Sequence, residues 1–362
     1  MIDSFGSMNS FGNIFRLTTF GESHGGAMGG VIDGLPAGHR FSLAAVAEEV
    51  ARRAPGRSAL ASQRREPDRV EFLSGLMGVD PESGELAALA GDSDMVVALG
   101  TPVGFIVRNS DMRSADYDAL RHVCRPSHAD YAWAMRYGGV RDWRGGGRAS
   151  GRETVSRVVG GAFARQILAA KGISVTSAIV SIGGIDNPAE EQIASMIASA
   201  RDDHDSVGGT VECVISGIPA GIGEPVFGKL DQMLAGAMFS IGAVKGVEFG
   251  MGFNGCARRG SEVSDAFSVD EAGRPVCPAN FSGGIQGGIS NGMPVVMRIA
   301  VKPTPTVPRP LHGLSDTGEP VVFEPHGRHD PCIMPRILPV VEVMAAMTVA
   351  DAMCLRNAGA KF

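Results

Sequence analysis

The stretch Val31-Ile32-Asp33-Gly34-Leu35-Pro36-Ala37-Gly38 recurs as Val214-Ile215-Ser216-Gly217-Ile218-Pro219-Ala220-Gly221, with six of eight positions identical. Each copy ends an apolar run typical of a β-strand and turns at Pro-Ala-Gly. A helical pattern then follows, over Leu43–Arg53 in the first copy and Pro225–Met238 in the second. Two such units half a chain apart predict duplicated halves around a pseudo-twofold axis. Chance similarity in a glycine-rich chain is the alternative.

The remaining elements indicate the fold class. No GxGxxG follows the first strand and no strict βαβ rhythm is present, which disfavours a dinucleotide-binding sheet. The pattern favours an α+β fold: a layered β-α-β sandwich with two similar halves, in which mixed or antiparallel sheets pack with helices. We expect residues 1–362 to form a single domain, with residues 1–10 as a flexible N-terminal extension. Further helices are predicted over Arg152–Lys171 (with Ser150 as N-cap), Pro188–Arg201 and Leu338–Leu355; strands are predicted over Met95–Leu99, Gly104–Arg108, Ser174–Ile182, Gly209–Ser216 and Pro294–Val301.

Composition limits the function classes. The 362 residues are 44% hydrophobic and 20% charged with a net charge of -6, which disfavours nucleic-acid binding through bulk positive charge. There is no signal-peptide pattern, and polar residues and Pro339 interrupt the apolar stretch from Ile337 to Leu355. The six cysteines form no CxxC pair, which fits free thiols in a reducing compartment. We therefore expect a cytoplasmic protein with no nucleic-acid or membrane partner.

Arginine outnumbers lysine 28 to 5, and guanidinium groups bind phosphate and carboxylate in a bidentate way. This bias indicates a site for a small anion, although ordinary surface ion pairs would account for many of these residues. The three places where arginines gather are Arg52, Arg53, Arg57, Arg64, Arg65 and Arg69; Arg121 and Arg125; and Arg141, Arg144, Arg148 and Arg152.

The segment Arg144–Thr154 places three consecutive glycines before a predicted helix and flanks them with arginines. Exposed amides, the positive end of a helix dipole and guanidinium groups together make an anion cradle. The segment lacks the Lys before Ser or Thr that a P-loop requires. Ser150 as a plain helix cap is the competing interpretation, and both can hold at once.

Two histidines are candidate acid–base groups. His24 lies among small residues in Gly21–Gly26, where it could donate a proton to a leaving group near neutral pH. The alternative is a loop histidine that is hydrogen-bonded to a backbone carbonyl. His128 follows Arg125 by three residues and precedes Asp130 by two, which predicts a polar pocket or a simple turn.

The segment His326–Cys332 spaces His, His and Cys three residues apart, but no second ligand pair with metal spacing stands elsewhere, so we expect no metal site. Asp330 precedes a proline, which favours an extended backbone and could aim the carboxylate. It could be a base or a structural turn acid.

Taken together, these segments resemble the chorismate synthase family from Phe11 to about Leu355. So many long motifs in the right order make this resemblance specific. The motifs are, in chain order, Gly21–Gly25, Arg52–Asp68, Arg125–Asp130, Arg144–Thr154, Gly221–Phe227, Ala243–Glu248, Gly283–Ser290, Lys302–Thr304 and Gly327–Cys332.

The resemblance implies a phosphate lyase of aromatic amino acid biosynthesis, the shikimate pathway. The family converts 5-enolpyruvylshikimate 3-phosphate to chorismate by anti 1,4-elimination. It uses reduced FMN, for which NADPH is a candidate reductant, and works as a homotetramer. By this resemblance His24 would protonate the departing phosphate and His128 would act near flavin N1. Asp330 would remove a proton from flavin N5, with Ser23 and Ser150 as proton relays.

The resemblance also implies the binding residues. Departures from the family pattern stand at Ala54, Ala59, Gly242, Ala149 and Gly151, and none removes a proposed catalytic side chain. For the substrate anions the implied residues are Arg53, Arg64, Arg125, Arg152 and Arg336. For FMN they are Arg148, Ala149, Ser150, Gly242, Ala243, Gly287, Lys302, Pro303, Thr304, Pro305, Thr306 and Arg328.

Two other functions compete with this prediction. One is a diverged paralogue that binds FMN or an anionic metabolite without turnover, which the missing basic residues would favour. The other is a flavin-dependent oxidoreductase, which would need a reductant site that the sequence does not reveal. The intact residues His24, His128 and Asp330 favour the lyase.

Overall fold

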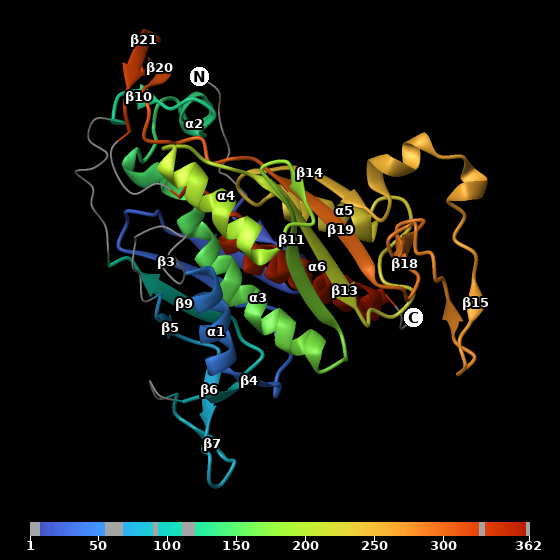
Figure 1. The fold of residues 1–362 in the computed structure, drawn as a ribbon. Helices are drawn as coiled ribbons and strands as arrows, with labels where there is room; N and C mark the ends of the chain where they lie inside the picture. The colour runs from blue at the N-terminus through green and yellow to red at the C-terminus, as the bar shows by residue number, and fades with distance from the viewer. Residues whose placement is uncertain (1–7, 55–67, 90–92, 111–119, 326–329, 360–362) are drawn as a thin grey trace.

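Two five-stranded antiparallel sheets carry the two predicted halves (Figure 1). The computed structural model describes residues 8–54, 68–89, 93–110, 120–325 and 330–359. The first sheet has the order β1 (Ser10–Phe11), β2 (Arg16–Phe20), β3 (Ala27–Asp33), β9 (Val103–Arg108) and β5 (Val70–Phe72). The second has the order β12 (Ile185–Asp186), β11 (Ser174–Ile182), β13 (Gly209–Ser216), β19 (Val295–Val301) and β14 (Val244–Phe249).

Both halves have the same topology. Chain order in the first is β2, β3, α1, β5, β9 and α3; in the second it is β11, β13, α5, β14, β19 and α6. In each half the second strand pairs with the first and the fourth, and the third strand lies outside the fourth. The helices are α1 (Leu43–Arg53), α2 (Asp130–Arg136), α3 (Thr154–Ala169), α4 (Glu190–Asp202), α5 (Leu230–Phe239) and α6 (Met334–Gly359).

The repeated stretch found in the sequence ends β3 and β13, the central strands of the two sheets. Gly34 and Gly217 hold the same position in the two copies and share a φ of +79°. A Cβ atom at Gly34 would lie 1.9 Å from the carbonyl oxygen of Ile14, and one at Gly217 would lie 2.2 Å from that of Gly172. Only glycine fits such a conformation and approach. The repeat therefore reflects a shared structural requirement, and the prediction of an α+β sandwich with two similar halves is confirmed.

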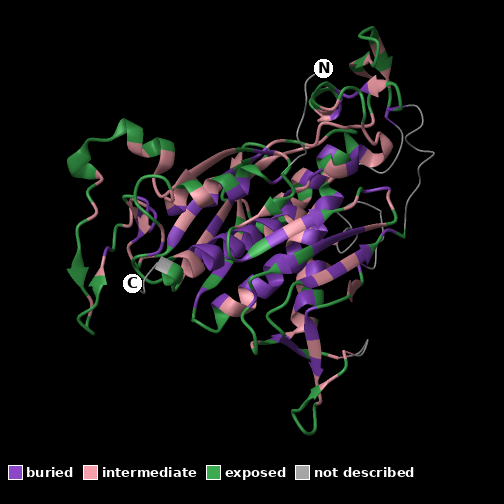
Figure 2. Ribbon diagram, turned by 180° about the vertical axis from the view of Figure 1, so that it is seen from behind, coloured by how far each residue is buried: buried purple, intermediate pink, exposed green. Residues whose placement is uncertain are grey.

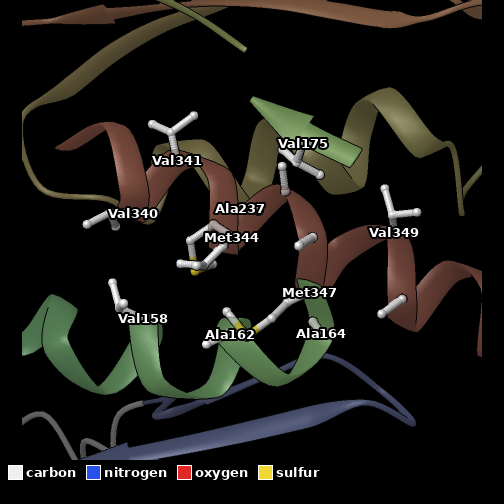
Figure 3. Packing of buried hydrophobic residues seen from close by; sticks show 14 of the residues in the cluster. Val158, Ala162, Ala164, Val175, Ala237, Val340, Val341, Met344, Met347 and Val349 are labelled. Atoms are coloured by element: carbon white, nitrogen blue, oxygen red, sulfur yellow. The ribbon is translucent and has the colours of Figure 1, made fainter. Parts of the chain in front are cut away.

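Helices from both halves form one layer between the sheets. Helix α3 packs against α6 and the first sheet, and α6 packs against α5 and strands β11 and β13. Figure 2 shows buried residues concentrated in this layer and on the sheets, with exposed residues in the peripheral hairpins. Methionine and valine side chains of α6 meet small residues of α3 and α5 at the centre of the core (Figure 3). The core is therefore shared by the two halves.

Helix α6 is long and apolar enough to pass a length-and-composition test for a membrane span. It is instead surrounded by protein, because Val340 to Ala352 is buried throughout. Its buried polar residues have partners. The Asp351 carboxylate accepts hydrogen bonds from the backbone N–H groups of Asn13, Ile14 and Phe15 at 2.7–3.1 Å. The helix is a core helix, and no membrane is indicated.

The predicted strand ranges agree with the structure to within one residue. Helix boundaries differ more. Helix α5 begins at Leu230 because Val226 has a φ of +73° and Glu224 N–H bonds to the Gly228 carbonyl in a turn. Helix α6 begins at Met334 and continues through Pro339, since burial of its apolar residues compensates for the lost hydrogen bond.

The smaller elements surround this frame. Of the expected flexible extension, residues 1–7 lie outside the described residues. Ser10 pairs with Thr18 in β1, so it is part of the first sheet and not of an extension. A four-stranded sheet contains β4 (Arg40–Ser42), β8 (Met95–Ala98), β6 (Leu76–Val79) and β7 (Leu86–Ala87); a three-stranded sheet contains β10 (Val123–Cys124), β20 (Leu311–Ser315) and β21 (Pro320–Phe323). Two hairpins are β15 (Ser268–Val269) with β16 (Pro275–Val276) and β17 (Ile285–Gln286) with β18 (Ile289–Ser290).

Candidate functional site

The glycine triplet before α3 lies between the two candidate histidines. Gly145, Gly146 and Gly147 have φ values of +58°, +84° and +53°, which residues with side chains rarely adopt. A Cβ atom on Gly145 would lie 2.4 Å from Cε1 of His24, and one on Gly146 would lie 3.0 Å from Cε1 of His128. Two adjacent glycines therefore bring His24 and His128 to one loop, although the histidines are far apart in the sequence.

His24 is buried beside Ser23 in the loop between β2 and β3. Ser23 Oγ lies 3.1 Å from His24 Nδ1 and donates to the Arg144 carbonyl at 3.3 Å. Because the hydroxyl hydrogen points to that carbonyl, the His24 Nδ1–H can donate to Ser23 Oγ. The other ring nitrogen, Nε2, is then the atom at which His24 can gain or lose a proton.

His128 is oriented by a buried carboxylate. Its Nδ1 lies 2.9 Å from Asp130 Oδ1, and Arg125 binds the same carboxylate through Nε at 2.6 Å and Nη2 at 3.0 Å. Arg141 Nη1 adds a fourth contact at 3.3 Å. Burial on its own raises the pKa of Asp130, but hydrogen bonds and charges from His128 and Arg125 outweigh it and hold that pKa well below its usual range. Asp130 therefore stays ionised and fixes the orientation of the His128 ring through Nδ1.

Two of the predicted substrate arginines share one buried carboxylate. Asp68 accepts a hydrogen bond from Arg53 Nη2 at 3.1 Å and pairs with Arg152 Nη1, and all three side chains are at most 3% exposed. Arg152 Nε also donates to Asn109 Oδ1 at 2.9 Å, and Asn109 Nδ2 donates to the Gly25 carbonyl beside His24 at 2.8 Å. This network connects the arginines to the His24 loop.

Asp330 joins the same network from the second half. Its carboxylate pairs with Arg336 Nη1, and Arg336 Nε donates to the Arg53 carbonyl at 3.4 Å. Its own carbonyl accepts a hydrogen bond from Thr304 Oγ1 at 2.7 Å. The predicted base therefore contacts Arg336, a predicted substrate residue, and Thr304, a predicted flavin residue, and Arg336 connects it to Arg53.

Most of the predicted flavin residues lie at the end of the glycine loop or in the segment that begins at Lys302. Arg148, Ala149 and Ser150 end the glycine loop. Ser150 Oγ accepts from the Arg152 N–H at 3.3 Å, so Ser150 caps the 3-10 turn Gly151–Glu153, whereas α3 itself begins at Thr154 after Glu153. Lys302 belongs to this region too, since its Nζ donates to the Ser127 carbonyl at 2.7 Å.

The other residues of the predicted FMN set continue from Lys302. Its backbone N–H donates to the Ala243 carbonyl at 2.9 Å, which brings the Gly242–Ala243 turn beside it. Residues Pro303, Thr304, Pro305 and Thr306 form the loop that follows β19.

Gly287 stands apart from these groups. It lies in the turn between β17 and β18, where the Leu230 N–H donates to the Gly288 carbonyl at 2.8 Å, at the N-terminal end of α5. Gly242 follows the C-terminal end of that 10-residue helix. The length of α5 therefore separates Gly242 from Gly287 by ~15 Å. Arg64 and Arg328, together with Arg57, Arg65, Ala59, His326 and His329, lie outside the described residues.

Two buried polar atoms show whether the residues present fit FMN. Arg148 Nη1 and Asp330 Oδ1 are buried and have no hydrogen-bond partner within the described part of the chain. An unsatisfied buried donor and acceptor are costly unless a polar ligand binds them. FMN offers a phosphate for the guanidinium and ring N–H groups for the carboxylate, so the residues present fit it. Among the described residues no cluster could hold a metal ion, and burial raises the pKa of the Cys332 thiol to about 11.

Sequence reasoning missed two residues that hold the site together, Asp68 and Asn109, and it predicted Asp130 only as part of a polar pocket or turn, without its role in orienting His128. Asp68 and Asp130 lie inside the segments quoted for the family, but nothing in their spacing shows which side chain each one binds. No pattern in the sequence pointed to Asn109, because its partners Arg152 and Gly25 are 43 and 84 positions away.

The fold and site define an α+β protein in which candidate acid–base residues lie beside buried guanidinium groups. The model of the chorismate synthase family matches residues 15–354. The chain is 45% identical to chorismate synthase from Azobacteroides pseudotrichonymphae genomovar. CFP2, covering 95% of this chain and 98% of that protein. It is 44% identical to chorismate synthase from Methanocella arvoryzae, covering 95% and 94%. A solved structure titled "Crystal Structure of Chorismate Synthase" superposes with a TM-score of 0.70 at 27% identity, covering 96% of this chain and 93% of that one. The chain belongs to the chorismate synthase family, lyases of the shikimate pathway.

Proposed function

We propose that this chain converts 5-enolpyruvylshikimate 3-phosphate to chorismate and phosphate by anti 1,4-elimination with reduced FMN. The observation that carries the proposal is the glycine loop, which brings His24 and His128 together next to the buried arginines Arg125 and Arg152. A phosphate and two carboxylates on one small ring require several guanidinium groups, and a water-poor site strengthens each contact.

The protein's part is to bind the anions and to move protons at fixed atoms. Arg53, Arg125, Arg152 and Arg336 would bind the substrate anions, together with Arg64. The charges of these arginines would also favour phosphate as a leaving group. His24 would deliver a proton from Nε2 to the departing phosphate, with Ser23 Oγ fixing the ring through Nδ1.

His128, held through Nδ1 by Asp130 and Arg125, would present Nε2 beside Gly146 to the flavin ring. Asp330 would accept a proton at Oδ1, the oxygen that no described group binds. Ser150, at the loop end, would relay protons. Reduced FMN supplies transient electron density for the elimination when it is bound.

The flavin would be held by Arg148, Ala149 and Ser150 from the loop, by Gly242 and Ala243, by the segment from Lys302 to Thr306, and by Gly287 and Arg328. The position of Gly287 supports the proposed homotetramer. Because α5 separates it from Gly242 by ~15 Å, a second subunit could bring its own Gly287 to the flavin. Sedimentation equilibrium should then give four times the chain mass of 37.6 kDa. A cytoplasmic location and NADPH as reductant complete the proposal.

An anaerobic assay with chemically reduced FMN tests the function. Release of phosphate together with chorismate is the expected result. Binding without release would indicate a diverged paralogue, and net oxidation of the flavin by substrate would indicate an oxidoreductase. A parallel assay with oxidised FMN and NADPH alone reports whether the chain reduces its own flavin.

A further inference from the structure

We propose that Arg157 is a positioning residue that fixes the turn from Ser240 to Ala243 against the glycine loop. The proposal rests on the proposed function, because Gly242 and Ala243 are predicted flavin contacts. Arg157 lies outside the segments quoted for the family resemblance and outside the predicted site residues. Its contacts nevertheless join the first half of the molecule to the second.

On the first-half side, Arg157 is fixed to the start of α3. Its Nε lies 2.9–3.0 Å from both carboxylate oxygens of Glu153, one helical turn earlier. Glu153 is 7% exposed and directly follows Arg152. The guanidinium therefore has a defined position relative to the end of the glycine loop.

On the second-half side, Arg157 holds the end of α5. Its Nη1 donates to Ser240 Oγ at 2.6 Å and its Nη2 donates to the Ser240 carbonyl at 3.1 Å. Ser240 is the C-cap of α5, where unsatisfied carbonyls and the negative end of the helix dipole favour a cation. An arginine from one half thus caps a helix of the other.

The turn that follows needs such support. Ala243 has a φ of +72°, a left-handed conformation that a non-glycine residue keeps only where its surroundings enforce it. After Ser240, the Val244 N–H bonds to the Ile241 carbonyl at 3.3 Å and the Lys302 N–H bonds to the Ala243 carbonyl at 2.9 Å. Arg157 supplies the anchor at the start of the turn and Lys302 the anchor at its end.

The geometry explains why an arginine stands here. One planar guanidinium reaches Glu153 with Nε and Ser240 with both terminal nitrogens. A lysine ammonium would keep the charge but could not span these partners in one fixed orientation. Charge alone is therefore not sufficient for this role.

The test compares Arg157→Met and Arg157→Lys with Arg165→Met. Arg165 lies two turns further along α3, and its Nη1 pairs with Glu49 and Glu342, away from the turn. The first readout is hydrogen exchange at the Val244 and Lys302 amides without flavin. The second is the FMN dissociation constant of the folded protein, from flavin fluorescence.

We expect Arg157→Met to speed exchange at both amides and to raise the FMN dissociation constant about tenfold, or about 1.4 kcal/mol. Arg157→Lys should recover less than half of that loss, and Arg165→Met should lower the melting temperature without either effect. Ser240→Ala, at an exposed position, removes the hydroxyl that accepts from Arg157 and donates to the Ala237 carbonyl at 2.6 Å. It should weaken FMN binding about threefold, which keeps the proposal testable if Arg157→Met folds poorly.

Three results would each overturn the positioning role. They are hydrogen exchange at the wild-type rate in Arg157→Met, an FMN affinity of that variant within twofold of wild type, and equal effects from the Arg157 and Arg165 variants. Because hydrogen exchange is measured without flavin, it tests the positioning role separately from the proposed function. If the wild-type protein released no phosphate, the exchange data would still decide whether Arg157 positions the turn.

Discussion

At the scale of single residues, the candidate site depends on glycines, which have no side chain, as much as on the side chains of the histidines. Gly145 leaves room for the His24 ring, and Gly146 leaves room for His128. Both glycines also have a positive φ, so a side chain there would meet backbone strain as well as the imidazole. At these two positions, glycine is therefore what allows the candidate histidines to approach the loop.

Replacing Gly145 by alanine should displace His24 and lower turnover by about tenfold or more. The matched control is Gly138→Ala, because Gly138 has a φ of +61° but a Cβ atom there would meet no other atom within 4 Å, and its rate should stay within about twofold. Steady-state phosphate release and a thermal melt measure the two effects. Equal losses in both variants would assign the effect to backbone strain and not to His24.

The variants His24→Ala and Asp330→Asn should each lower turnover by about a hundredfold or more while the fold is retained. His24 would lose its proton donor, and Asp330 would lose an acceptor while keeping its shape. Anaerobic single-turnover rates, with circular dichroism as the folding check, decide the matter. Near-normal rates in either variant would contradict the role assigned to that residue.

At the scale of elements, the repeated turn and the buried carboxylates of α6 organise the layers. Glu342 of α6 binds Arg52 of α1 with two hydrogen bonds at 2.7 and 3.0 Å, pairs with Arg165 of α3 and accepts from Ser177 N and Oγ of β11. One carboxylate therefore connects four elements. The neighbour of Arg52, Arg53, points into the site, so this anchor also steadies a predicted substrate residue.

The two copies of the turn give an internal test. Gly34→Ala and Gly217→Ala should each destabilise the protein by about 2 kcal/mol or more, because each adds a close clash with a carbonyl oxygen to the cost of a positive φ. Gly38→Ala has the same φ of +79° without a neighbouring atom and should cost about 1 kcal/mol. Urea unfolding measures all three. A loss at only one of the two repeated positions would argue against structural equivalence of the halves.

Glu342→Gln should destabilise the protein by about 3 kcal/mol at pH 7, since Arg52 and Arg165 lose their most buried carboxylate partner and keep only their contacts with the more exposed Glu49 among the described residues. Burial alone raises the pKa of Glu342, but hydrogen bonding and charge from Arg52, with Arg165 and Ser177, lower it overall. This stabilisation is present above the ordinary glutamate pKa of about 4.3 and is lost as the pH falls from there through the lowered native value. Unfolding free energies between pH 7 and pH 3 should therefore fall more steeply for the wild type. Parallel pH curves would contradict the coupling.

At the scale of the whole molecule, the halves are not separate units. Helices α3 and α6 pack together in one layer, and Arg53, Asp330 and Arg336 join residues from both halves. Both tryptophans, Trp133 and Trp143, lie in the first half. Tryptophan fluorescence therefore reports on that half, whereas circular dichroism at 222 nm reports on all helices.

Urea unfolding followed by these two probes should give one coincident transition, because neither half buries its core alone. The six cysteines are free thiols, so a reducing agent should leave the midpoint unchanged. Two separated transitions would show that the shared helix layer does not couple the halves.

The sequence by itself determined the duplicated architecture and most element positions. Alternating apolar residues and turn glycines depend on near neighbours, which is why β11 and β13 match their predicted ranges and the repeat at Gly34 and Gly217 revealed the two halves. The family motifs likewise identified His24, His128 and Asp330 as candidates.

Only the tertiary structure decided which side chains meet. Asp68 joins Arg53 to Arg152, Gly145 lies against His24, and Arg157 caps the helix that ends at Ser240. Most of these partners are dozens of positions apart, so no local period can predict them. Their pairing follows from burial: once the layers close, each buried charge must find a partner, and the packed fold determines which one lies within reach.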